Sequence, residues 1–139
     1  MRLLACCMVH VVFLAATAAC CQDLSVQIVD GRNGQPMNKF RVYIILDDPK
    51  DASALSLLTG RDGEIRFDPG NAKTLQVRPV GAVECSPPTI AAYGHNSIEE
   101  IRKTGLVGLN YCGRANMKPL PGRLVIYARP ATWWELFKN

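Results

Sequence analysis

Apolar and polar residues alternate along the stretch 24–77, and short turn sequences interrupt the alternation. Every second position is apolar at Val26 and Ile28, and the same spacing returns at Phe40, Val42, Ile44 and Leu46. A period of two places alternate side chains on the same face of a β-sheet. The stretch is therefore predicted to form half-buried strands.

Turn residues divide this stretch into five short strands. The strands are expected at 24–30, 40–46, 54–59, 64–67 and 74–78. Segments 54–59 and 64–67 flank the tight Gly60-Arg61-Asp62-Gly63 turn, and we expect them to pair as a hairpin. Short strands joined by tight turns predict an all-β fold, a small antiparallel β-sandwich.

The second half of the chain is expected to add one or two short helices and a further strand. Ser97 and Glu100 form a capping box for a helix over 98–104, and Gly105 can end it. We expect this helix to cover one edge or end of a sheet. The segment 89–93 is predicted to be extended, and the apolar run 124–128 is short enough for a buried strand that joins the core.

The N-terminus has the pattern of a secretory signal peptide. Arg2 precedes a largely apolar run over 3–19, which is shorter and less uniform than a membrane-spanning helix requires. A leader over 1–21 leaves 22–139 as a single domain, exported to a periplasmic or extracellular location. Lipid anchoring through Cys20 or Cys21 is the alternative to removal of both cysteines with the leader.

Charge and hydropathy argue against two classes of partner. The chain has 16 basic and 12 acidic residues, and the basic ones are scattered rather than gathered into a stripe. Nucleic acid is therefore not an expected partner. Beyond the leader, no apolar run approaches bilayer length, so no membrane span is expected in the mature chain.

Several turn and strand residues follow one another in the order found in a known family. They are Val26-x-Ile28-x-Asp30, Asn33-Gly34-x-Pro36, Val42, Thr59 with Asp62-Gly63, and Phe67. Over about residues 24–80 the chain resembles the carboxypeptidase regulatory-like domains. The resemblance implies a transthyretin-like sandwich, found attached to secreted or outer-membrane bacterial proteins and usually non-catalytic, with 81–139 as an extension. The related hydrolases of 5-hydroxyisourate use several histidines and a C-terminal Tyr-Arg-Gly-Ser signature, and this chain has neither.

Two cysteines, Cys85 and Cys112, remain after removal of the leader. In an oxidising compartment they are predicted to form one disulfide that ties the extension to the sandwich. The competing hypothesis makes one of them a nucleophile with His95 as its base, in a small secreted hydrolase.

The remaining polar residues do not form a recognisable catalytic or metal site. His95 is the one histidine outside the leader, and zinc sites usually need three or four ligands. Asp47, Asp48 and Asp51 lack the ligand spacing of a dedicated calcium loop. Glu99 and Glu100 are better explained by helix capping than as an acid/base pair. We assign no catalytic residues, metal or cofactor.

The function expected from these observations is a non-catalytic binding or accessory domain. Its partner would be an envelope or extracellular protein or glycan. Tandem tryptophans near the C-terminus suggest a carbohydrate platform or a partner anchor, but Thr132 and Glu135 also predict a short capped helix. Helical spacing would place Trp133 in the core with Leu136 and Phe137, and leave Trp134 as the more exposed, possible binding residue.

Overall fold

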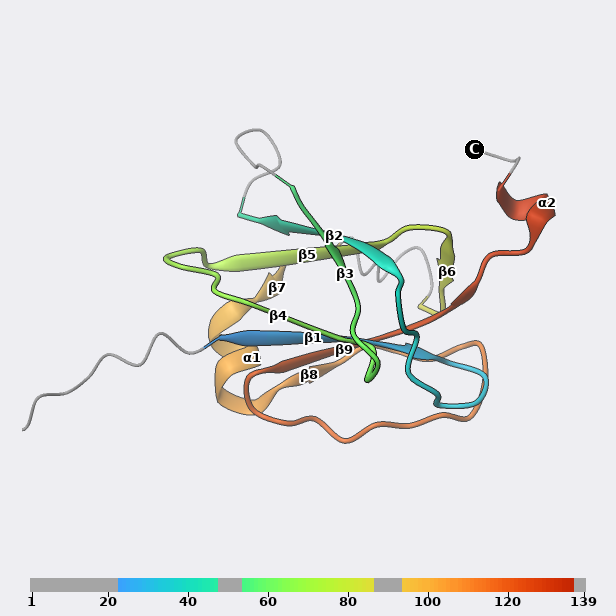
Figure 1. The fold of residues 1–139 in the computed structure, drawn as a ribbon. Helices are drawn as coiled ribbons and strands as arrows, with labels where there is room; N and C mark the ends of the chain where they lie inside the picture. Colours follow the sequence, from blue (N-terminus) through green and yellow to red (C-terminus); the bar gives the residue numbers. More distant parts are fainter. Residues whose placement is uncertain (1–22, 48–53, 87–93, 137–139) are drawn as a thin grey trace, which may run out of the picture.

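The computed structural model describes residues 23–47, 54–86 and 94–136, which fold as two packed β-sheets with two short helices (Figure 1). The strands are β1 (Leu24–Asp30), β2 (Arg41–Leu46), β3 (Leu55–Leu58), β4 (Glu64–Phe67), β5 (Thr74–Pro79), β6 (Ala82–Glu84), β7 (Asn96–Ser97), β8 (Leu106–Val107) and β9 (Arg123–Pro130). The helices are α1 (Ile98–Thr104) and α2 (Trp133–Leu136). The predicted small all-β sandwich is confirmed.

The first sheet is built around the pairing of β1 with β9. Its order is β4-β1-β9-β6, and β8 also pairs with β9. The β9 strand runs parallel to β1, from Ser25 opposite Arg123 to Asp30 opposite Ala128, and parallel to β8. The last long strand of the chain therefore lies at the centre of this sheet, beside the first.

The second sheet has the order β3-β2-β5-β7, and its pairings are all antiparallel. The core lies between the two sheets. From β1 it takes Leu24, Val26 and Ile28, which are fully buried, and from β9 it takes Leu124, Ile126 and Ala128. The alternate residues of these strands face the other side of the sheet, as the period of two predicts.

Helix α1 has the predicted bounds and closes one end of the sandwich. The backbone N–H of Glu100 donates to Ser97 Oγ at 3.3 Å, and Ile98 and Ile101 are buried in the core. Gly105 ends the helix with φ of 75°, and its Cα lies so close to the Leu120 backbone that a side chain would clash with it.

Two features differ from the sequence-based expectation. The strands β3 and β4 do not form a hairpin: β3 pairs with β2 in one sheet, whereas β4 pairs with β1 in the other. The Gly60 to Gly63 turn thus carries the chain between sheets. The short strands β6, β7 and β8 were not predicted, because two or three residues are too few to show a period. The extended segment predicted at 89–93 lies outside the described residues.

Candidate binding site

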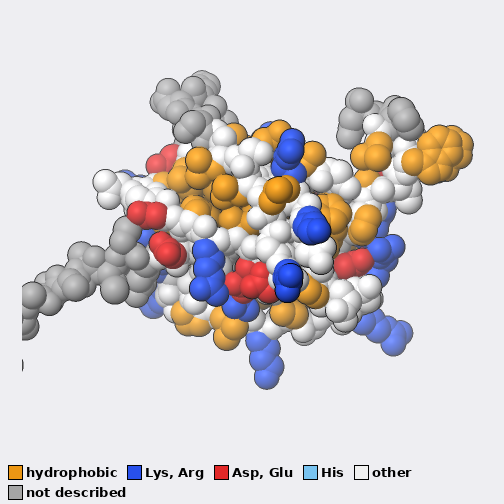
Figure 2. Space-filling model, viewed as in Figure 1, with side chains coloured by type: hydrophobic (Ala, Val, Ile, Leu, Met, Phe, Trp, Pro, Cys, Tyr) orange, Lys and Arg blue, Asp and Glu red, His pale blue; other side chains and the backbone are white. Residues whose placement is uncertain are grey.

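Helix α2 holds the most exposed cluster of large apolar side chains in the part of the chain that the structure describes. Trp133 is 56% exposed, Trp134 65% and Leu136 57%, and no residue of α2 is buried. The hydrophobic side chains of α2 project beyond the main body of the molecule, at the upper right of Figure 2. The two indole rings stack, with their centroids 3.3 Å apart.

The prediction that Trp133 belongs to the core is wrong. Leu136 follows Trp133 by three positions in the helix, as the predicted spacing requires, but both side chains are more than half exposed. Phe137, the third expected member, lies outside the described residues. Trp134 is the more exposed of the two tryptophans, as predicted, although the difference is small.

The start of α2 follows from the capping residues seen in the sequence. The backbone N–H of Thr132 donates to Glu135 Oε2 at 2.9 Å, and the Thr132 hydroxyl donates to the same oxygen at 2.8 Å. Glu135 therefore binds back to the residue that precedes the helix, which is one half of a capping box. This contact sets the start of a helix only one turn long.

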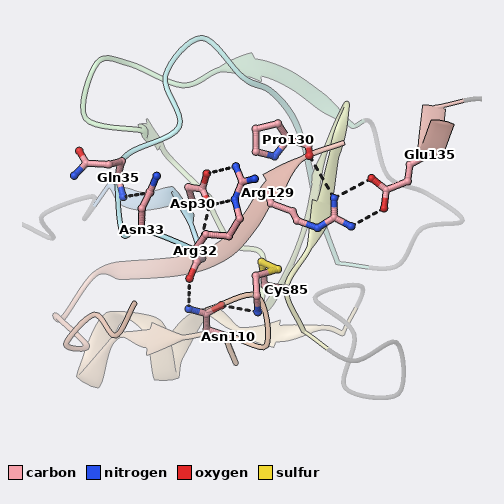
Figure 3. A network of polar contacts seen from close by, with 11 residues as sticks. Asp30, Arg32, Asn33, Gln35, Cys85, Asn110, Arg129, Pro130 and Glu135 are labelled. Atoms are coloured by element: carbon pink, nitrogen blue, oxygen red, sulfur yellow. Dashed lines mark hydrogen bonds and ion pairs between the residues drawn. A yellow bond between two sulfur atoms is a disulfide. The ribbon is translucent and has the colours of Figure 1, made fainter. Parts of the chain in front are cut away.

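A bidentate ion pair connects α2 to the end of β9. The Arg129 guanidinium donates to both carboxylate oxygens of Glu135, at 2.8 and 2.5 Å (Figure 3). This pairing and the bonds from Thr132 hold the pKa of Glu135 well below its usual range, and they raise that of Arg129. Such bidentate pairs fix geometry more firmly than single contacts. The tryptophans are therefore displayed on a tethered helix.

A second ion pair lies at the C-terminal end of β1, beside the end of β9. Asp30 accepts hydrogen bonds from the backbone N–H and the guanidinium of Arg32, at 2.7 to 3.0 Å, and these bonds lower the pKa of Asp30 (Figure 3). The Arg129 charge lies close enough to lower the pKa of Arg32, against the larger effect of Asp30. Arg32 and Arg129 thus each have a carboxylate partner of their own.

The predicted disulfide is confirmed, and it borders this end of the molecule. Cys85 and Cys112 are bonded at 2.08 Å, and Cys85 packs with Val29, Val125 and Tyr127 in a second apolar cluster on the outer face of the first sheet. Asn110 donates to the Gly31 carbonyl at 2.8 Å and accepts from the Cys112 N–H at 3.1 Å. The disulfide and these hydrogen bonds of Asn110 together hold the loop after β8 against the sandwich.

The disulfide argues against the Cys/His hydrolase hypothesis, which requires a free cysteine. Both sulfur atoms are in the bond, so neither is a thiolate nucleophile. His95 lies elsewhere, with its Nε2 3.1 Å from Gln76 Nε2.

The other polar residues considered from the sequence have structural roles or lie apart. Asp47 Oδ1 accepts from the backbone N–H groups of Lys73 and Thr74, which lowers its pKa, while Asp48 and Asp51 lie outside the described residues. Glu99 and Glu100 occupy the first turn of α1. Within residues 23–47, 54–86 and 94–136, no three His, Cys, Asp or Glu side chains gather closely enough to hold a metal ion.

Glu84 on β6 is a chemically distinctive residue that sequence reasoning missed. Its side chain is half-buried, and its Oε1 has no hydrogen-bond partner. Burial raises the pKa of Glu84 to about 7, against smaller opposing effects of Arg78 and Ser86. A strand of three residues offers no sequence signal of such burial.

Comparison of the chain with family models, with curated proteins and with solved structures finds no significant match. Neither of the helices in the described residues has the length and apolar character that crossing a bilayer requires. The disulfide is compatible with an exported protein.

Proposed function

We propose that this chain is an exported, non-catalytic binding domain, and that it docks a partner protein through the exposed tryptophans of α2. The observation that carries the proposal is the exposure of Trp133, Trp134 and Leu136 together on one tethered turn of helix. Tryptophan is among the residues most enriched at the energetic centres of protein interfaces. Exposure of a cluster of large apolar side chains to water is unfavourable in free energy, and burial against a partner surface would remove that exposure.

The surroundings of the rings favour a protein partner over a glycan. Sugar recognition needs polar groups beside the aromatic platform to bind hydroxyls. The polar side chains of Arg129, Thr132 and Glu135, in or just before α2, are engaged with one another. What α2 offers a ligand is therefore mainly apolar surface, which suits a hydrophobic groove on another protein.

Two further observations support the export and the non-catalytic role. The Cys85–Cys112 bond suits an oxidising compartment, consistent with the leader expected over 1–21. The resemblance of residues 24–80 to carboxypeptidase regulatory-like domains implies an accessory domain, and both sheets contain strands from this stretch.

Capture from the envelope and extracellular fractions tests the proposal. The two tryptophans of the chain both lie in α2, so a Trp133→Ala/Trp134→Ala variant removes the site. We expect the wild-type chain to retain a partner protein that this variant loses. Leu120→Ala is the matched control, because Leu120 is an exposed apolar residue near the opposite end of β9.

Intrinsic fluorescence provides a second readout of the same site. The tryptophan emission of the chain comes from Trp133 and Trp134. It should therefore shift to shorter wavelength when a captured partner covers these rings. Equal retention of the partner by the wild type and the double variant would refute docking through α2. A shift caused by a glycan from an array, rather than by a protein, would assign the site to carbohydrate instead.

A further inference from the structure

A second candidate site lies at the other end of the sandwich, where three cations gather without carboxylate partners. Elsewhere in the described residues four arginines form ion pairs of 2.5 to 3.3 Å: Arg32 with Asp30, Arg66 and Arg123 with Glu64, and Arg129 with Glu135. No salt bridge between described residues involves Lys73, Arg102 or Lys103. These three side chains nevertheless line one groove.

The groove lies between α1 and the turn that joins β4 to β5. The Ile98 N–H donates to the Lys73 carbonyl at 3.0 Å, which brings the first residue of α1 against this turn. Lys73 comes from the turn, whereas Arg102 and Lys103 come from the last turn of α1. Their convergence therefore depends on the packing of α1 and is not visible as a run of charge in the sequence.

The groove combines this charge with an apolar floor. Ala72 and Ile98 line it, and its volume is about 560 Å³, which falls in the range of small-molecule sites. Glu99 is the one acidic residue among its lining residues in the described chain. Asp47 also lies near Lys73, but its carboxylate binds backbone N–H groups there. The lining residues thus carry an excess of positive charge.

Arg102 is held in place rather than free to move in solvent. Its side chain is half-buried, and its Nε is buried without a hydrogen-bond partner. A guanidinium that is already positioned loses less conformational entropy on binding.

We propose that this groove binds a phosphate or sulfate monoester carried by a sugar or a lipid headgroup. Lys73 and Lys103 would supply charge from the two sides, and Arg102 would supply a fork of N–H donors suited to such oxygens. This site is independent of α2 and of the partner proposed there.

Titration of the full chain with glucose 6-phosphate, followed by backbone amide shifts, tests the site. We expect shifts at residues 72–73 and 97–104, and none with glucose. The Lys73→Gln/Lys103→Gln variant should bind about tenfold more weakly, since it removes two of the three cations that line the groove. Glu99→Gln should bind more tightly, and added salt should weaken binding.

A charge-matched variant separates a site from general attraction. Lys39→Gln/Arg61→Gln removes the same charge from exposed loops outside the groove and should bind like the wild type. Vesicles containing phosphatidic acid form a parallel arm: binding to vesicles alone, lost in the Lys73→Gln/Lys103→Gln variant, would keep the site and assign its ligand to lipid. Absence of binding in both arms, equal shifts with glucose, or equal weakening by the control variant would overturn the proposal.

Discussion

The two helices begin with the same sequence signal and end in opposite environments. Ser97 precedes α1 and Thr132 precedes α2, each with a glutamate three positions later inside the helix, and in both helices a capping contact forms. Ile101 of α1 is fully buried, whereas Trp133 of α2 is 56% exposed. Capping satisfies backbone N–H groups within one turn, and it carries no information about what the helix packs against.

The difference also separates two ways of holding a helix. The α1 helix is held by apolar burial in the core, which is insensitive to pH and salt. The α2 helix is held by the Arg129–Glu135 pair and by its link to β9. The first arrangement contributes to the stability of the whole domain, and the second leaves apolar surface available to a partner.

The largest expected effect comes from truncating one apolar residue in each helix. Ile101→Ala should lower the free energy of unfolding by about 2 to 5 kcal/mol, because it empties space in the core. Trp133→Ala should change it by about 0.5 kcal/mol or less, since the ring is mainly in solvent. Denaturant melts measure both, and equal losses would show that α2 packs on the domain in solution.

Removing the disulfide tests whether the loop after β8 is stabilised separately from α2. The bond joins residues 27 apart, and the chain-entropy model gives a loss of about 3 to 4 kcal/mol for Cys85→Ala/Cys112→Ala. Tryptophan emission of the folded variant should match the wild type, because α2 is tethered by Arg129. An altered emission spectrum before unfolding would link the disulfide loop to α2.

Removal of the capping hydroxyls should distinguish the helices by a smaller margin. Ser97→Ala should cost about 1 kcal/mol in unfolding free energy, because a cap on a helix packed in the core is lost. Thr132→Ala should leave the melt nearly unchanged and weaken the near-ultraviolet circular dichroism of the stacked tryptophans. A comparable loss of unfolding free energy in both variants would contradict this distinction.

Two glutamates should give pH dependences of opposite sign. The raised pKa of Glu84, about 7 against 4.5, means that the folded state binds this proton more tightly. Unfolding free energy should therefore fall as pH rises from about 4.5 to about 7, and Glu84→Gln should remove that fall. Melts at several pH values between about 4.5 and 7 measure it, and an unchanged slope in the variant would exclude Glu84 as its source.

Glu135 should respond in the other direction. Its pKa is depressed, so its contribution is complete above the usual value of 4.5 and is lost only as pH falls toward the lower folded value. The dichroism of the tryptophan pair should accordingly persist below pH 4.5. Its loss at the ordinary carboxylate pKa would show that the Arg129 pair does not form in solution.

Sequence periodicity located the strands well because it depends on neighbouring residues. The bounds of β1, β4 and α1 agree with those predicted, and those of β2, β3, β5 and β9 differ by one or two residues at an end. The hairpin prediction failed because a turn sequence specifies a reversal of the chain and not the strand that will be hydrogen-bonded. The turn between β3 and β4 changes sheets, so β3 pairs with the preceding strand β2 and β4 pairs with the first strand, β1.

By itself, the sequence determined the strand period, the turns, the capped start of each helix and the one cysteine pair left for a disulfide. Each of these depends on a few adjacent residues or on simple elimination. Only the tertiary structure decided that β9 lies beside β1, that Glu84 is half-buried and that Lys73 meets Arg102. It also decided that Trp133 is 56% exposed rather than part of the core. These outcomes depend on which distant segments pack together, and burial is a property of that packing rather than of any local pattern.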